Sequence, residues 1–262
     1  MSRHLSGSFL FLLAGLFALP FLAIALSAVA TDWSDALLPR HIGLDVITSV
    51  LGDPRFQASV LRSLAISFTA LALSLALIVP AIVAAHVYWP ALDRWFARLV
   101  VLPYAVPAVV LVVGYLRVFS QPPVQINGTP TLLALAYVPL CFPMLYVNVK
   151  NALQGLAVRD WLDAGRLVGA TDERVLLCVV LPMIAPAIGL ACVLNLGILM
   201  GEFVYANLLV GGRFETLQIY MFAQRSESGS VTSVIILAYF LTLLLLTALA
   251  IWLSARGGTD KR

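Results

Sequence analysis

Apolar runs separated by short polar segments dominate this chain and predict six membrane-spanning helices. Each run is about 20 residues or longer, the length that an α-helix needs to cross a bilayer. The runs cover residues 9–30, 59–87, 99–119, 131–149, 184–207 and 231–253. Pro103 and Pro107 lie in the third run. We still expect one helix there, because neighbouring helices in a membrane can satisfy the carbonyls that a proline leaves free.

The first run has a second interpretation, because Ala28-Val29-Ala30 at its end resembles a signal-peptidase site. The apolar core of a signal peptide is about 7–15 residues long, whereas the uncharged run over 9–30 is longer. More apolar runs also follow it. We therefore expect a retained first span and then an outer loop with some helix over 31–58.

Lysine and arginine residues predict the orientation, because cytoplasmic loops carry an excess of them. With six spans, both termini lie on the same side. If that side is the cytoplasm, the inner segments hold Arg3, Arg94, Arg98, Lys150, Arg159, Arg166, Arg174, Arg256, Lys261 and Arg262. The outer segments then hold Arg40, Arg55, Arg62, Arg117, Arg213 and Arg225. The larger set favours cytoplasmic termini.

Composition supports a protein surrounded by lipid. Hydrophobic residues make up 61% of the chain and charged residues 11%, against about 25% charged residues in soluble domains. The net charge of +3 is spread along the chain, which argues against a nucleic-acid partner. Cys141, Cys178 and Cys192 lie in apolar sequence without a CxxC pair, as buried side chains do. No pattern of metal ligands or catalytic residues is present, so we expect neither a metal site nor an enzyme.

The longest predicted cytoplasmic segment, 150–181, has the pattern of two short helices. Asp160 can cap a helix that begins at Trp161. Gly169 suits the left-handed position that ends such a helix. The sequence therefore predicts a first helix over 161–168.

A second helix is predicted directly after that glycine. Thr171 can cap it, and Asp172 and Glu173 would lie in its first turn, where negative charge is favourable. We expect this helix to give way to the fifth span near Pro182.

One face of the first helix carries Trp161, Ala164, Gly165 and Val168 at helical spacing. An exposed tryptophan beside small residues would fit a groove in a partner protein, with Asp163 at the rim. An amphipathic helix that lies on the bilayer surface would have the same pattern. The residues alone leave both interpretations open.

The segment resembles the loop signature of permease subunits from binding-protein-dependent ATP-binding-cassette (ABC) importers. That signature is Glu-Ala-Ala, three residues, Gly, nine residues and Ile-x-Leu-Pro. The matching residues here are Asp163-Ala164-Gly165, then Gly169, then Val179-Val180-Leu181-Pro182. The spacing agrees throughout, and the departures are Asp for Glu, Gly for the second Ala, and Val for Ile. The Gly at position 165 puts the helical geometry of the first helix in question.

The resemblance implies an all-α, type I importer permease of the bacterial inner membrane. Residues 59–253 would form the permease domain, after a first span and outer loop over 1–58 and before a cytoplasmic tail over 254–262. The 161–168 helix would be a coupling helix seated on an ATPase. The chain itself has no Gly-Lys dipeptide and hence no phosphate loop.

Partners follow from the same resemblance. They are two copies of the ATPase, which would bind ATP and magnesium, a second permease subunit, and a periplasmic solute-binding protein. The loops over 32–58 and 208–230 would be the outer contacts for the binding protein. This chain would carry no cofactor and would form half of the translocation path.

Two weaker features of the sequence bear on the transported solute. Glu202 lies in an apolar run, where a carboxylate by default indicates a function. It could attract a cationic solute, or it could pair with a neighbouring helix. Asn195, seven residues earlier, would share its helix face, and Tyr205 completes the candidate path residues. Stretches 117–129 and 201–209 resemble spermidine/putrescine permeases, and 120–129 also resembles 2-aminoethylphosphonate permeases, with iron and thiamine permeases more distant.

Three rival classes explain less of the chain. A secondary transporter would need broken helices or ion-coupling groups in the membrane, and only Glu202 offers a buried charge there. A membrane enzyme lacks catalytic residues. A scaffolding protein would leave the 160–182 pattern unexplained. We therefore expect an importer permease, with a polyamine as the first candidate solute and 2-aminoethylphosphonate or another organic or iron solute as the alternative.

Overall fold

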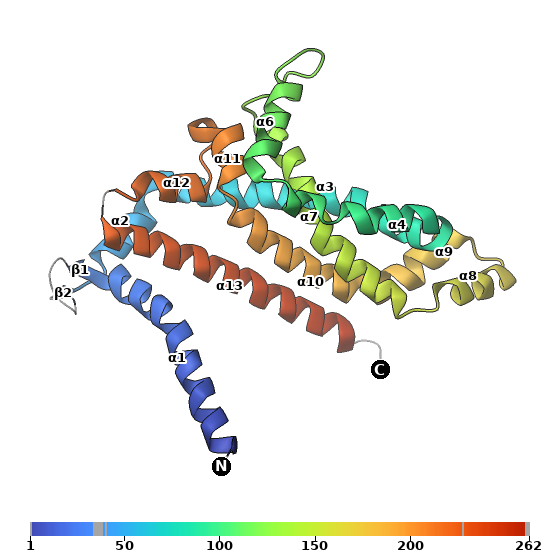
Figure 1. Cartoon of the computed structure of the whole chain (residues 1–262), viewed down its shortest axis with the longest axis horizontal. Helices are drawn as coiled ribbons and strands as arrows, with labels where there is room; N and C mark the ends of the chain where they lie inside the picture. Colours follow the sequence, from blue (N-terminus) through green and yellow to red (C-terminus); the bar gives the residue numbers. More distant parts are fainter. Residues whose placement is uncertain (1, 34–38, 40, 227, 260–262) are drawn as a thin grey trace. The chain divides into compact units, whose positions relative to one another are not determined.

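The computed structural model describes residues 2–33, 39, 41–226 and 228–259. Most of them lie in helices (Figure 1). The chain forms two compact units, of which one comprises Met1–Val60 with Tyr220–Leu244 and the other Leu61–Ile219 with Leu245–Arg262. The boundaries of the permease domain at residues 59 and 253 stay predictions.

The first unit combines the N-terminal part of the chain with residues 220–244. Its elements are α1 (Ser2–Val29), β1 (Ala30–Asp32), β2 (His41–Ile42), α2 (Asp45–Gly52) and parts of α3 (Pro54–Tyr88), α12 (Leu217–Gln224) and α13 (Gly229–Thr259). The strands are antiparallel, with Ala30 opposite Ile42. The rings of Phe21 and Phe240 lie 5.2 Å apart and join α1 to α13. From Phe9 to Leu22 the large exposed side chains of α1 are apolar, as expected for a helix in lipid.

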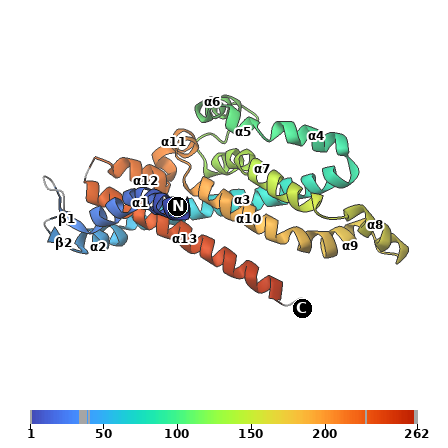
Figure 2. The same cartoon turned by 60° about the horizontal axis from the view of Figure 1, so that its bottom comes forward.

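The second unit contains the buried core. Its remaining elements are α4 (Pro90–Leu99), α5 (Leu102–Ala105), α6 (Ala108–Phe119), α7 (Pro130–Gln154), α8 (Val158–Leu167), α9 (Asp172–Val175), a π-helical turn (Leu176–Val180), α10 (Leu181–Met200), α11 (Val204–Leu209) and a 3₁₀ turn (Gly211–Phe214). Figures 1 and 2 both show α7 beside α10. Leu145, Val149, Ile184 and Ala191 are fully buried in this core.

Helix α4 is attached to α7 by polar and aromatic contacts. Lys150 forms an ion pair with Asp93, and the Tyr146 hydroxyl donates to the same carboxylate at 3.2 Å. The ring of Phe96 meets those of Phe142 and Tyr146 edge-on, at 5.7 and 6.4 Å. These contacts hold one face of α4, and its other residues are exposed.

Five helices in the described part of the chain are long and apolar enough to cross a membrane. They are Phe9–Val29, Pro54–Tyr88, Pro130–Gln154, Asp172–Met200 and Gly229–Ala248. Segments Pro90–Ala105 and Ala108–Phe119 pass the same test together but are bent by 100°. The prediction of six spans is met if this bent pair counts as one.

The expectation of an uninterrupted helix over 99–119 was wrong. Val106 has an extended conformation, with φ −93° and ψ 127°, as residues before proline prefer. Pro107 then cannot donate a backbone hydrogen bond, and α6 begins only at Ala108. The prolines therefore break this segment, although α3, α7 and α10 each contain a proline without a break.

Candidate functional site

Helix α8 begins one turn earlier than its sequence pattern indicated. Its N-cap is Ala157, and Asp160 lies in the first turn, so the prediction of Asp160 as the cap was wrong. Val158 and Leu162 are both 3% exposed, and their burial favours the extra turn. Asp160 still contributes negative charge near the positive end of the helix.

Gly169 ends α8 as predicted. Its φ is +79°, a conformation that glycine adopts without steric cost. The N–H of Ala170 donates to Gly165 O at 2.9 Å, and the N–H of Gly169 donates to Arg166 O at 3.1 Å. This pair of bonds is the Schellman motif, which satisfies carbonyls at the end of a helix.

The predicted cap of the second helix is confirmed. The Thr171 hydroxyl accepts from the N–H of Arg174 at 3.4 Å, and Asp172 and Glu173 lie in the first turn of α9. Helices α8 and α9 with Gly169 between them, residues 158–175, are named the α8–α9 hairpin below.

The exposed tip of the hairpin is not the tryptophan. Trp161 is half-buried and packs against the core, so the expectation of an exposed side chain was wrong. Leu167 and Val168 are instead 89% and 82% exposed, and Ala164 and Asp163 are exposed beside them. The sequence pattern did not indicate Leu167, because this residue lies outside the helix face that carries Trp161.

A shallow groove of about 430 Å³ lies between the two helices of the hairpin. Trp161, Ala164, Gly165 and Val168 line its α8 side, so the predicted face does form a surface. The other side comes from α9 and the π-helical turn. A side chain added at Gly165 would collide with Val175 across this groove.

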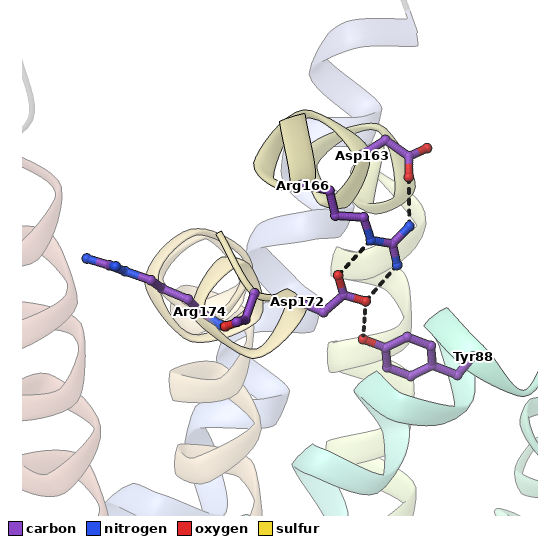
Figure 3. A network of polar contacts seen from close by, with 6 residues as sticks. Tyr88, Asp163, Arg166, Asp172 and Arg174 are labelled. Atoms are coloured by element: carbon purple, nitrogen blue, oxygen red, sulfur yellow. Dashed lines mark hydrogen bonds and ion pairs between the residues drawn. The ribbon is translucent and has the colours of Figure 1, made fainter. Parts of the chain in front are cut away.

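Arg166 connects the two helices through charge. Its Nε and Nη2 donate to the two carboxylate oxygens of Asp172 at 2.8 and 2.7 Å, and its Nη1 donates to Asp163 at 3.0 Å (Figure 3). The hydrogen bond with Asp172 is the main cause that raises the pKa of Arg166 above its ordinary value. The Tyr88 hydroxyl, from the end of α3, donates to Asp172 at 3.1 Å. Arg174 points away from this cluster (Figure 3).

The fifth span begins before the predicted residue 184. Helix α9, the π-helical turn and α10 are continuous and form the candidate span Asp172–Met200. The N–H of Leu181 donates to Leu176 O, five residues back. Pro182 follows in the first turn of α10, directly after the π-helical turn. Leu181 and Pro182 thus lie where the hairpin continues into the membrane.

The candidate path residues lie at the other end of α10. Helix α10 ends at Met200, so Glu202 lies in a break before α11, and the prediction that it shares a helix face with Asn195 was wrong. The N–H of Tyr205 donates to the Glu202 carboxylate at 3.0 Å, and the Tyr137 hydroxyl donates to Glu202 O at 3.4 Å. Helix α11 therefore begins against Glu202.

Asn195 and Tyr205 are buried. The Asn195 amide is 0% exposed and donates to Ala191 O at 2.9 Å and to Cys141 O on α7 at 3.5 Å. Tyr205 is 2% exposed. Its ring lies 6.4 Å from those of both Tyr115 and Tyr137. The three rings and Glu202 form an aromatic and acidic cluster, although Asn195 faces the α7 contact.

The predicted outer loop over 208–230 is packed over residues 215–220 and exposed over much of the rest. Leu217 is buried, and its N–H donates to Ser63 Oγ at 2.8 Å. Gln218 is also buried and donates to Met200 O at 3.3 Å. Arg213 and Phe222 are exposed in this stretch. In the described residues, no group of three His, Cys, Asp or Glu side chains could hold a metal ion.

Two permeases are similar in sequence to this chain, one over most of its length and one over about half. PhnV of Salmonella choleraesuis (strain SC-B67), named for a 2-aminoethylphosphonate transport system permease, is 28% identical over 245 residues, which are 92% of this chain and 91% of PhnV. PotC of Escherichia coli (strain K12), named a spermidine/putrescine transport system permease protein, is 27% identical over 144 residues, 54% of this chain and 53% of PotC.

Solved structures show the same fold at low identity. A chain of a bacterial ABC transporter involved in the import of the acidic polysaccharide alginate superimposes with a TM-score of 0.74 at 18% identity, covering 95% of this chain and 97% of that one. A chain of the inward-facing MetNI methionine ABC transporter has a TM-score of 0.63 at 18% identity, covering 76% and 94%.

A family model described as the inner membrane component of binding-protein-dependent transport systems matches residues 76–256. This match includes the whole α8–α9 hairpin and the span that follows it. The chain therefore belongs to this family and is a permease of an ABC importer, as the signature over 163–182 indicated.

Proposed function

We propose that this permease imports a small organic solute that carries a primary ammonium group, and that the α8–α9 hairpin is its docking element for a separate ATPase. The hairpin carries the second part of this proposal. Its exposed tip, Leu167 and Val168, is apolar and lies beside Asp163 and Ala164. Exposed apolar residues with polar neighbours are typical of a protein interface.

The docking surface would include Asp163, Ala164 and the tip. Trp161 and Gly165 would support it from behind, because Trp161 packs on the core and Gly165 on Val175. Gly169 would fix the end of α8. When the ATPase moves the hairpin, Leu181 and Pro182 would pass that displacement on to α10. Both termini would then lie in the cytoplasm, on the side of the ATPase.

The solute class rests on the chemistry shared by two relatives. Spermidine and putrescine are polyamines, and 2-aminoethylphosphonate also carries an amine, so both classes present an alkyl ammonium ion. A carboxylate and aromatic rings are the groups that bind such an ion. Glu202 and Tyr115 are the partly exposed members of the cluster and would make this contact, with the buried rings of Tyr137 and Tyr205 packed beside them. Because Asn195 is fully buried, we do not propose it as a contact to the solute.

A polyamine is our first candidate solute. The 2-aminoethylphosphonate is a second candidate, favoured by one observation: the match to PhnV covers 91% of that protein, whereas the match to PotC covers 53%. The phosphonate group would need positive charge elsewhere, on the second permease or on the solute-binding protein. Glu202 is the ammonium contact in both cases.

The proposed complex contains two ATPase subunits, a second permease and a periplasmic solute-binding protein. A related alginate transporter is solved in complex with its periplasmic protein, which supports the last of these. Purification of this chain through an affinity tag from its own membranes would test the set. We expect an ATPase with a phosphate loop to copurify, together with a second permease.

Reconstituted complexes would then test the solute. Import of labelled putrescine, spermidine and 2-aminoethylphosphonate would be measured with the cognate binding protein and ATP. Saturable import of one of them supports the proposal. Import of only solutes without an amine would contradict the solute class, whereas absence of any ATPase from the purified complex would contradict the docking role.

A further inference from the structure

Three elements that are distant in sequence meet at one carboxylate. Asp172, the first residue of α9, accepts two hydrogen bonds from Arg166 of α8 and one from Tyr88 at the end of α3. Tyr88 and Asp172 are 84 residues apart in sequence. Figure 3 shows the guanidinium, the carboxylate and the phenol hydroxyl in one cluster. Arg166, Asp172 and Tyr88 are named the clasp below.

The clasp has a stiffer geometry than a single ion pair. A guanidinium that donates to both oxygens of a carboxylate fixes the direction as well as the distance between the groups. The second amino group of Arg166 also binds Asp163, which limits rotation of the arginine. The clasp therefore keeps α8 in place against α9 on one side of Gly169, while the Schellman bonds do so through the backbone.

The clasp contributes little to stability. Arg166 is 54% exposed, Asp163 71% and Asp172 26%, and ion pairs that are open to water stabilise a fold only slightly. The position of the clasp is informative instead. It lies where α8 meets the ends of the candidate spans Pro54–Tyr88 and Asp172–Met200.

We propose that Arg166, Asp172 and Tyr88 transmit the displacement of α8 to both α3 and α10, and so couple ATP hydrolysis to transport. This inference rests on the proposed docking role of the α8–α9 hairpin. The backbone already links α8 to α10 through Gly169 and α9. The hydroxyl of Tyr88 adds the connection to α3, which the backbone does not provide at this end. The three side chains are positioning residues, because they would act through the helices that they join.

The test compares variants in the complete complex with its ATPase, second permease and binding protein. Arg166→Gln removes the bidentate contact, and Arg94→Gln is the matched control, since it removes one exposed arginine from α4, outside both the hairpin and the clasp. The readout is the number of solute molecules imported per ATP hydrolysed. We expect Arg166→Gln to lower this ratio by about fivefold or more, the lower range of coupling between sites, and Arg94→Gln to leave it unchanged.

Two further variants separate transmission from a general effect on folding or docking. The exchange Arg166→Asp with Asp172→Arg restores an ion pair of opposite direction, and we expect it to recover part of the ratio. Tyr88→Phe removes a single hydroxyl from α3 without touching the docking helix, and we expect a smaller loss of the ratio at normal basal ATPase activity.

Two results would overturn the inference. One is a wild-type ratio of solute imported per ATP hydrolysed in Arg166→Gln. The other is a lowered ratio in Arg166→Gln that the charge exchange does not recover, together with a wild-type ratio in Tyr88→Phe. Failure of the wild-type complex to import any solute with ATP would instead contradict the proposed function. Copurification of the ATPase with each variant distinguishes loss of docking from loss of transmission.

Discussion

The side chain of Val175 occupies the space in which a side chain on Gly165 would lie. A Cβ atom added to Gly165 would approach Val175 Cγ2 more closely than real Cβ atoms approach other atoms, and it would also lie 3.9 Å from the Cβ of Ala170. Helices α8 and α9 therefore pack more closely than an alanine at position 165 would allow. This contact explains why the chain departs from the second Ala of the family signature.

We predict that Gly165→Ala destabilises the protein and that Val175→Ala largely reverses the effect. Alanine favours a helix by up to about 1 kcal/mol over glycine, whereas overpacking costs about 1–3 kcal/mol, so the collision should outweigh the helix preference. Thermal unfolding in detergent would measure it. The double variant should unfold at a higher temperature than Gly165→Ala alone, and simple additivity of the two single changes would show that the contact is unimportant.

Local signals predicted one part of the hairpin, and tertiary contacts determined the rest. Gly169 and Thr171 were predicted because a left-handed C-cap and an N-cap depend on neighbours within four residues. The need for glycine at position 165 depends on Val175, ten residues away on another helix, and no local pattern indicates it. Trp161 was misplaced for the same reason: its face of α8 turns towards the core, which sequence periodicity alone does not orient.

The membrane segments show the same division. The apolar runs located five spans because length and hydrophobicity suffice for that. The break at Pro107 was not predicted, because a proline in an apolar run does not always interrupt the helix. Pro80 in α3 and Pro186 in α10 cause no break. Neighbouring helices decide whether a proline interrupts a span, and the sequence does not show the neighbours. Glu202 was likewise placed inside a helix that ends at Met200.

Gly169 is required for its backbone conformation and not for lack of space. Nothing lies within 4 Å of a Cβ atom added there, but φ is +79°. We predict that Gly169→Ala costs about 1 kcal/mol, that Gly169→Asn costs less, and that Gly169→Pro uncouples ATP hydrolysis from uptake. Gly189→Ala, in the middle of α10 with equal space, is the control and should not destabilise. Unfolding temperatures give the order, and wild-type transport by Gly169→Pro would contradict the docking role.

The ion pair of Asp93 with Lys150 should behave as a buried pair. Its side chains are 18% and 16% exposed, so removal of one partner leaves a charge with little water. We predict that Lys150→Met costs roughly 1–3 kcal/mol, the range for a largely buried polar group that loses its partner, because an unpaired charge in such a place is unfavourable. Asp93→Asn with Lys150→Met should cost less than the single change. Unfolding in detergent measures both, and equal losses in the two variants would show that the charge is unimportant.

Asp53 and Tyr220 give a pH-dependent contribution to stability. The Tyr220 hydroxyl donates to Asp53 at 2.6 Å and is the main cause that lowers the pKa of this carboxyl, followed by the N–H of Arg55. Because the folded pKa lies below the unfolded value of about 3.9, the stabilisation is complete above the unfolded pKa and is lost as pH falls through the folded pKa.

We therefore predict that Tyr220→Phe lowers the unfolding temperature at pH 7 and that its difference from wild type shrinks below about pH 4. The phenylalanine keeps the ring contact with Phe56, whose centroid lies 5.8 Å away, so the variant removes only the hydroxyl. Unfolding scans across pH 3 to 7 would measure the difference. A difference that stays constant with pH would mean that the hydroxyl acts independently of the Asp53 charge.

The variant Glu202→Gln distinguishes a role of this residue in solute transport from a role in the fold. Glutamine at position 202 can still accept the hydrogen bond from the Tyr205 N–H, so Glu202→Gln should leave the start of α11 intact while removing the negative charge. We predict that it lowers import of a cationic solute by about tenfold, as expected for loss of a charged hydrogen bond, and changes basal ATPase activity much less. Glu173→Gln, which removes an exposed carboxylate at the opposite end of the span, is the control for net charge. Equal import by Glu202→Gln and wild type would leave Glu202 with a structural role. Its backbone carbonyl would then serve only to accept from the Tyr137 hydroxyl, and one side-chain oxygen only to accept from the Tyr205 N–H at the start of α11.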